Sequence, residues 1–512
     1  MLGKNFAHNL VNSRLTHKTG IAPLKGADDK IVFDNLAKAE LLNKHFVTSG
    51  TIDDGALPES LCHCPGTINS VRFDCADIIT VVNKLKSNSS AGPDGLPPIL
   101  FKTLKHHLAK PLSMMFSLIL QSGQLPDEWK TAIVKPIFKK GKSSDVNNYR
   151  PISLTCVCCK IFESIVKNHL LVHLLSNSII TKTQHGFLSK HSTTTNLIES
   201  LNDWTQSLEL RKPIKVLYID FEKAFDKVSV TKLVHKLKQV GIGGPLLLSI
   251  ISFLSNRLQA VRIGNAQSKY LPVISGVPQG SVLGPFLFLL YINDLPDFLN
   301  SNICSKLFAD DLKAYGSYVS QGDYDELQLT LNRLVDWSNQ WQLKLSVGKC
   351  GSLLITGNSK SDDSHELFID KENLAVFDTV RDLGVIVDPS LNFSKHIDNA
   401  ISKANQRLYL LLKSFKNRNI SLMVFAFKVY ILPLLDYCSP IWSPCKLLDI
   451  DRIENVQRSF TKKLDGLIDL PYPQRLIACN LPSLELRRVW ADLVLCFKIV
   501  HNQIALSFGD FF

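Results

Sequence analysis

Two adjacent carboxylates, Asp310 and Asp311, stand in the middle of an apolar stretch of this chain. They follow the run Lys306-Leu307-Phe308-Ala309, and the pattern of residues 305–315 predicts a tight hairpin that bends at the acids. Neighbouring acids in apolar surroundings repel each other and resist ionisation unless a cation lies between them. Mg²⁺ is the natural partner, because hard cations prefer carboxylate oxygens. Taken alone, however, the pair fits an ordinary acidic turn better, since Asp is common in loops.

The length and charge of the chain set broad limits on its class. A chain of 512 residues is too long for one core and predicts two to four structural units. Its formal net charge of +12 favours a polyanionic partner such as nucleic acid, although other basic proteins share this balance. The longest apolar run, Val282 to Ile292, is too short to span a bilayer and predicts a buried helix, so no membrane partner is expected.

The twelve cysteines are spread thinly along the chain. One of the densest groups, Cys62, Cys64 and Cys75, lacks the paired spacing of a zinc site, even with His63 beside it. We therefore expect reduced thiols in an intracellular protein. The nucleus and the cytoplasm are the compartments expected for a protein with a nucleic-acid partner. Residues 1–19 are polar and do not form a secretory signal.

Hydrophobic periodicity predicts a chain of mixed helices and strands. Helices are expected over residues 34–46, 74–85, 104–120, 156–176, 192–209, 230–240, 326–343 and 483–500, and the part beyond residue 390 is expected to be mostly helical. Strands are expected over residues 131–138, 214–219, 259–263, 270–274 and 352–356. Residues 48–67 are rich in Gly, Pro and Asp and predict a linker.

A third carboxylate, Asp220, ends the strand predicted over residues 214–219. If this strand lies beside the hairpin of Asp310 and Asp311, all three carboxylates converge at one end of a sheet. Such an arrangement holds two Mg²⁺ ions, which align an attacking oxygen with a phosphorus and stabilise the leaving oxygen. The sequence predicts the strands but leaves their pairing open.

Three segments of the chain form a recognisable series in a fixed order. They are Tyr218-Ile219-Asp220-Phe221-Glu222-Lys223-Ala224-Phe225-Asp226-Lys227-Val228, Ser275-Gly276-Val277-Pro278-Gln279-Gly280-Ser281-Val282-Leu283-Gly284-Pro285, and Phe308-Ala309-Asp310-Asp311. They resemble the first catalytic motif, the nucleotide-binding motif and the catalytic hairpin of reverse transcriptases from non-LTR (LINE-type) retrotransposons, in particular the jockey and CR1-like elements. Further matches lie at Ser90 to Gly95, Trp129 to Lys142, Asn148 to Leu154, Gln184 to Thr193, Leu345 to Cys350 and Arg381 to Val385, so that the resemblance covers residues 80–500.

The resemblance implies an α+β right-hand polymerase with fingers, palm and thumb and a mostly helical C-terminal part. It divides the chain into an N-terminal extension and linker (1–79), fingers and palm (80–390, with a core at 130–387) and a helical thumb-like region (391–512). The implied function is an RNA-directed DNA polymerase that adds dNTPs to the 3′-OH of a DNA primer on an RNA template.

The resemblance also assigns metal and proton chemistry to particular residues. Asp220, Asp310 and Asp311 would ligate Mg²⁺, or Mn²⁺ in its place, with Asp310 the firmer ligand of the hairpin pair. Lys349 would protonate the departing pyrophosphate. The ordinary alternative for this lysine is a solvated surface position.

The nucleotide would be bound by Phe225, Gln279, Gly280, Arg150 and Lys139. In this interpretation the Phe225 ring excludes a ribose 2′-OH, and the glycine lets the backbone approach the nucleotide in front of a helix N-terminus that favours anions. Arginine suits phosphate because its guanidinium makes two parallel hydrogen bonds. The ordinary alternatives are core packing for the Phe225 ring, a plain turn for Gln279 and Gly280, and a solvated basic hairpin for Lys139 and Arg150.

Departures from the family pattern motivate a second hypothesis. The family often has Arg after Gly-Phe and before Ser-Thr, where this chain has Leu188 and His191, and Ser346 is also altered. The protein would then be a catalytically silent nucleic-acid-binding remnant. Full-length elements of this type carry an endonuclease before the polymerase, and we expect this chain to begin downstream of it.

Overall fold

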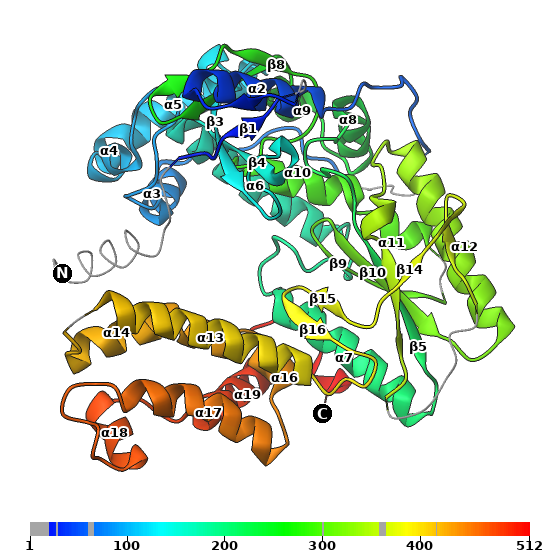
Figure 1. Cartoon of the computed structure of the whole chain (residues 1–512). Helices are drawn as coiled ribbons and strands as arrows, with labels where there is room; N and C mark the ends of the chain where they lie inside the picture. The colour runs from blue at the N-terminus through cyan, green and yellow to red at the C-terminus, as the bar shows by residue number, and fades with distance from the viewer. Residues whose placement is uncertain are drawn as a thin grey trace.

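The computed structural model of the chain describes residues 20–26, 29–59, 66–299, 302–357, 365–415 and 417–511. Cys62, His63 and Cys64 lie outside these ranges. The fold combines helices with two five-stranded sheets, as the α+β class requires. In Figure 1 the second sheet and the N-terminal helices lie at the top, the first sheet at the right and the C-terminal helices at the bottom.

The first sheet contains the predicted strands around the acids. Its order is β14 (Ala375–Val376), β11 (Gly351–Ile355), β5 (Ile214–Ile219), β10 (Asp311–Ser317) and β9 (Cys304–Phe308). All neighbours are antiparallel except β11 and β14. The central strand β5 is mostly apolar, apart from Lys215, and is buried on both faces, because helices cover each side of the sheet.

The second sheet is built on a parallel pair of strands from distant parts of the chain. Its strands are β4 (Tyr149–Leu154), β3 (Thr131–Phe138), β6 (Arg257–Ile263) and β7 (Ala266–Gln267), and β8 (Leu271–Val273) also pairs with β6. The predicted pairing of the strand at 259–263 with that at 270–274 is confirmed in part: residues 257–259 of β6 pair with 271–273 of β8, whereas Arg262 and Ile263 pair with β7. The parallel pairing of β3 with β6 had no signal in the local sequence.

The largest hydrophobic core lies between one face of the first sheet and a group of helices. These are α3 (Cys75–Lys84), α4 (Pro98–Thr103), α5 (Lys105–Ser122), α6 (Val157–Ser176), α8 (Val230–Gln239), α9 (Gly244–Leu254), α10 (Leu283–Ile292), α11 (Leu295–Phe298) and α12 (Gln321–Gln340). Helix α10 is buried on nearly all sides, as its sequence predicts. None of the helices in the described ranges is long and apolar enough to cross a lipid bilayer.

A second core joins the other face of the first sheet to the C-terminal helices. Val216 of β5 points into this core, whereas the next residue, Leu217, points into the first one, as the two-residue period of a strand requires. The helices are α7 (Thr193–Glu209), α13 (Ser394–Ser414), α14 (Ile420–Tyr430), α15 (Leu432–Asp436), α16 (Ser439–Trp442), α17 (Leu447–Thr461), α18 (Tyr472–Cys479) and α19 (Leu484–Val500). A short hairpin of β15 (Val380–Asp382) and β16 (Val385–Val387) lies between this helical part and the first sheet (Figure 1).

The segment predicted to be an extension packs on the second sheet. Helix α2 (Asn35–Thr48) begins as predicted at Asp34, whose Oδ2 accepts a hydrogen bond from the Ala37 N–H at 2.8 Å. Leu42 of this helix shares a small core with Val261 of β6. The remaining short elements are β1 (Leu24–Lys25), β2 (Ile31–Val32), β12 (Phe368–Ile369), β13 (Glu372–Asn373) and the 3₁₀ turns η1 (Asp127–Lys130), η2 (Val146–Asn148), η3 (Val347–Lys349) and η4 (Phe508–Asp510).

Candidate active site

The pairing of β5 with β10 brings Asp220 to the two acids of the hairpin. The strands are antiparallel, with Ile219 opposite Leu312. Asp220 follows Ile219 and Asp311 precedes Leu312, so the two carboxylates stand on neighbouring strands at the same end of the sheet. The strand pairing that the sequence left open is therefore the one that convergence of the acids requires.

The hairpin turns within two residues. Phe308 pairs with Asp311, so Ala309 and Asp310 form the bend. Ala309 has a φ of 58°, in the left-handed region that residues with a Cβ avoid. Such a conformation persists only where the surroundings hold it, which makes the packing around Ala309 important for the position of Asp310.

Desolvation and mutual repulsion raise the pKa of both hairpin acids. Burial raises the pKa of Asp310, and the charge of Asp220 adds to this effect. The pKa of Asp311 is raised to about 6, first by desolvation and then by the charges of Asp310 and Asp220. Carboxylates crowded in this way are typical of functional sites, where a cationic ligand supplies the missing positive charge.

Three predicted cationic side chains lie around these acids. Lys349, in η3, has its Nζ 3.0 Å from Asp220 Oδ2. Arg150 and Lys139 come from β4 and from the residue after β3, and both charges act to lower the pKa of Asp310. The pKa of Lys139 is itself lowered by burial and then by the charges of Arg150 and Lys349. The second sheet thus supplies positive charge to acids carried by the first.

A cavity of about 310 Å³ opens beside the carboxylates. Asp220, Asp311 and Lys349 line it together with residues 379–383, which include β15 and the start of the turn toward β16. Residues 381–385 resemble a family motif but are not among the site residues that the sequence predicts. Their place in the wall of the same cavity as the acids comes from tertiary packing.

A buried ion pair fixes this hairpin to the first sheet. Lys313 Nζ lies 2.7 Å from Asp382 Oδ2, with the two side chains 4% and 6% exposed. On its other side the hairpin is held by the Tyr437 hydroxyl, which donates to the Leu383 carbonyl at 2.6 Å. This part of the cavity wall is therefore tied both to strand β10, which carries Asp311, and to the C-terminal helices.

The loop of residues 275–280 interlocks with the turn that follows β5. Gln279 Nε2 donates to Asp226 Oδ1 at 2.8 Å. The Val277 N–H donates to the Phe225 carbonyl, also at 2.8 Å, and the Gly276 N–H donates to Val228 at 2.8 Å. Two of the predicted motifs are thus in direct contact, and the side-chain partner of Gln279 in this structure is Asp226.

Gly280 has a packing reason for its identity. It has a φ of 115°, and a Cβ on it would lie 2.4 Å from the Ser153 carbonyl oxygen of β4. The prediction that the N-terminus of α10 offers free N–H groups to an anion is wrong. Glu163 Oε2 already accepts hydrogen bonds from the Val282 and Leu283 N–H groups at 2.7 and 2.9 Å. Glu163 lies 119 and 120 residues from its partners, so the local sequence gave no sign of this contact.

The Phe225 ring is half-buried. It stacks on Phe288 with ring centroids 4.3 Å apart and meets the edge of Phe187 at 6.4 Å. The first contact provides the core packing that the ordinary alternative required. The exposed part of the ring leaves room for the contact with a bound sugar that the resemblance implies.

The oxygen donors of this site fit Mg²⁺ in kind. Within the described ranges, no three His, Cys, Asp or Glu side chains form a group tight enough to hold a metal ion by themselves. Mg²⁺ at nucleotide sites binds through one or two carboxylates and completes its coordination with water and substrate phosphates. The acids at this sheet end therefore suit a metal that arrives together with a nucleotide.

Comparison with known proteins agrees with the geometry. Residues 137–387 match the family described as reverse transcriptase (RNA-dependent DNA polymerase). The chain is 27% identical over 402 residues to the probable RNA-directed DNA polymerase from transposon X-element of Drosophila melanogaster, covering 77% of this chain and 44% of that protein. It is 26% identical over 429 residues to the RNA-directed DNA polymerase from mobile element jockey of the same species, covering 80% and 46%.

The family match over residues 137–387 includes Asp220, Asp310 and Asp311. The chain therefore contains a reverse transcriptase domain of the type found in non-LTR retrotransposons, which confirms the family predicted from the motifs. The chain spans less than half the length of these curated relatives.

Proposed function

We propose that the protein is an RNA-directed DNA polymerase of a non-LTR retrotransposon, extending a DNA primer with dNTPs on an RNA template. The observation that carries this proposal is the meeting of Asp220 with Asp310 and Asp311 at one sheet end, beside three cations. The first sheet would be the palm, the second sheet with its helices the fingers, and α13–α19 the thumb. The net charge of +12 suits the nucleic-acid partners.

The reaction assigned to this site is nucleotidyl transfer. The primer 3′-oxygen attacks the α-phosphorus of the dNTP, the new P–O bond forms, and the bond to the β-phosphate oxygen breaks to release pyrophosphate. Mg²⁺, or Mn²⁺ in its place, would supply charge stabilisation for the attacking and leaving oxygens. Asp220, Asp310 and Asp311 would hold the ions, with Asp310 the firmer ligand of the pair.

The surrounding side chains would bind and orient the nucleotide. Arg150 and Lys139 would contact the triphosphate, and Lys349 would deliver a proton to the departing pyrophosphate. Its contact with Asp220 keeps its ammonium group at the reacting centre. Phe225 would exclude a 2′-OH, and Gln279 would hold the turn that carries this ring through Asp226. We place the activity inside the cell, in the nucleus and cytoplasm, where dNTPs and RNA templates are found.

Primer extension by the purified protein tests the proposal. We expect Mg²⁺-dependent incorporation of dNTPs on an RNA template by the unchanged chain and none by Asp310→Asn. The matched control is Asp469→Asn, which alters an exposed carboxylate outside both sheets and leaves extension unchanged.

The competing hypothesis is a silent nucleic-acid-binding remnant, suggested by Leu188 and His191. Salt-sensitive RNA binding without any incorporation by the unchanged chain would favour it. Equal incorporation by Asp310→Asn and the unchanged chain would exclude the proposed site.

A further inference from the structure

The free edge of the first sheet is covered by the segment of residues 183–186. Strand β9 is the last strand of this sheet. Its Leu307 N–H donates to the Thr183 carbonyl, and the His185 N–H donates back to the Leu307 carbonyl, each at 2.9 Å. The segment therefore follows β9 in a parallel bridge up to the catalytic bend.

Gln184 reaches from this segment to the backbone of the bend itself. Its Oε1 accepts the Ala309 N–H at 2.9 Å and the Gly186 N–H at 2.7 Å. Its Nε2 donates to the Ala309 carbonyl at 3.4 Å. The side chain is 2% exposed, so these contacts are made away from water. The amide of Gln184 thus binds both the N–H and the carbonyl group of Ala309.

The neighbouring glycine shows how close this approach is. A Cβ on Gly186 would lie 2.4 Å from the Ala309 nitrogen, closer than non-bonded atoms can approach. Residue 186 must therefore lack a side chain for the 183–186 segment to sit against the bend.

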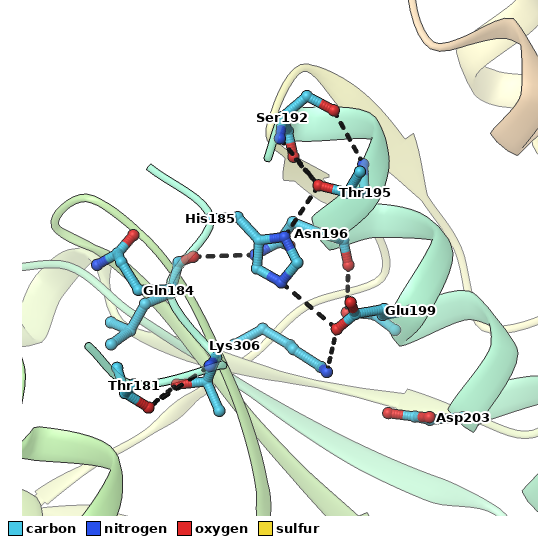
Figure 2. A network of polar contacts seen from close by, with 12 residues as sticks. Thr181, Gln184, His185, Ser192, Thr195, Asn196, Glu199, Asp203 and Lys306 are labelled. Carbon is cyan, nitrogen blue, oxygen red and sulfur yellow. Dashed lines mark hydrogen bonds and ion pairs between the residues drawn. The ribbon is translucent and has the colours of Figure 1, made fainter. Parts of the chain in front are cut away.

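A second group of polar contacts anchors the segment to helix α7 (Figure 2). His185 Nδ1 lies 2.9 Å from Thr195 Oγ1, and His185 Nε2 lies 3.4 Å from Glu199 Oε2. Glu199 also receives a hydrogen bond from Lys306 Nζ of β9 at 2.5 Å. Asn196 Nδ2 donates to the Leu307 carbonyl at 3.1 Å. The 183–186 segment is thereby held by β9 and by helix α7.

We infer that Gln184 is a positioning residue for nucleotidyl transfer: it holds Ala309 in its left-handed conformation and so sets the place of the Asp310 carboxylate. The inference rests on the proposed function. Without the amide, two buried N–H groups lose their acceptor and Ala309 is free to relax to a negative φ. The bend would then rotate, and a displacement of about 1 Å at a reacting centre costs on the order of 10²-fold in rate.

The test is a cycle of variants at positions 184 and 309. Gln184→Met keeps the approximate length of the side chain but has no donor and only a weak acceptor, the thioether sulfur. We expect kcat for dNTP incorporation to fall on the order of 10²-fold, with a much smaller change in KM for the dNTP. Adding Ala309→Gly should restore kcat at least about tenfold, because glycine adopts a positive φ without a steric cost. Ala309→Gly alone completes the cycle.

Gln457→Met is the matched control. Gln457 is also a fully buried glutamine, whose Nε2 donates to Pro482 and Tyr472, but it lies in α17. Its loss should lower the melting temperature and leave kcat unchanged. An effect of Gln184→Met no larger than that of the control, or a double variant that is not restored, would overturn the inference.

Amide hydrogen exchange provides a readout that does not depend on polymerase activity. Gln184→Met should speed exchange in residues 307–312, and Gln457→Met should not. If the unchanged chain is inactive, the proposed function is refuted. The exchange measurement still tests whether Gln184 holds the bend at Ala309. Unchanged exchange in Gln184→Met would contradict it.

Discussion

The buried pair of Lys313 and Asp382 gives a quantitative prediction about the cavity wall. The pair joins β10, next to the acids, to the β15–β16 hairpin, and residues of both elements line the cavity. Lys313 Nζ also lies 5.5 Å from the centre of the Trp204 ring, and burial lowers the pKa of this lysine. We consider Lys313→Met, Asp382→Leu and the double variant.

The expected magnitudes follow from burial. Removing one partner leaves the other charge in a site that is at most 6% exposed, and such losses cost about 3–5 kcal/mol of stability. Replacing both partners with apolar side chains of similar size removes the unpaired charge, so the double variant should lie within about 1–2 kcal/mol of the unchanged chain. The single variants should therefore be strongly non-additive.

Urea unfolding followed by tryptophan fluorescence measures these differences. The exposed pair of Lys25 and Asp29, at 2.8 Å with side chains 56% and 81% exposed, is the matched control. Breaking it should change the free energy of unfolding by less than about 1 kcal/mol. Additive losses for Lys313→Met and Asp382→Leu, or single losses as small as the control, would refute the reasoning.

Three further predictions concern single positions. Phe225→Val should raise incorporation of ribonucleotides relative to deoxynucleotides by on the order of tenfold in a primer-extension competition, and unchanged discrimination would reduce this ring to core packing. Gly280→Ala should lower the free energy of unfolding by about 1–3 kcal/mol, because the new Cβ would lie 2.4 Å from the Ser153 carbonyl oxygen at a residue with positive φ. A loss below a few tenths of a kcal/mol would contradict this contact. His396, whose Nδ1 accepts the Ile386 N–H at 3.1 Å, has its pKa lowered to about 4 by burial, so the unfolded chain binds a proton there that the folded chain does not. The neutral form of His396 therefore contributes to the free energy of unfolding above about pH 6.5, and this contribution, at most about 3 kcal/mol, is lost as the pH falls toward 4. His396→Asn should flatten the pH dependence of stability in this window. An unchanged slope would exclude the effect.

The sequence predicted elements best where local signals mark both ends. Residues 131–138 and 214–219 form strands with the predicted bounds, and Asp34 caps its helix as expected. The helix predicted over residues 483–500 is also present. Its apolar series behaves differently, since Leu493 is 62% exposed and Phe497 is 54% exposed. Periodicity identified the helix but not the face that packs against the protein.

The contacts that shape the site could not be predicted, because they join residues far apart in the chain. Gln184 and Ala309 are separated by 125 positions, and Lys313 and Asp382 by 69. A glutamine or a lysine has many candidate partners until the strands are placed. The acids were recognisable because they belong to an ordered series of motifs that resembles a known family, whereas an ordinary side chain such as Lys313 gives no sign of its distant partner.

The central claim is that carboxylates from two distant segments form one metal site. Mn²⁺ binding measured by electron paramagnetic resonance, with primer–template and a non-hydrolysable dNTP analogue present, tests it most directly. We predict that Asp220→Asn and Asp310→Asn each weaken binding of the same Mn²⁺, and that the double variant is no weaker than the more affected single one. Independent, additive losses, or full Mn²⁺ binding by Asp220→Asn, would contradict the account.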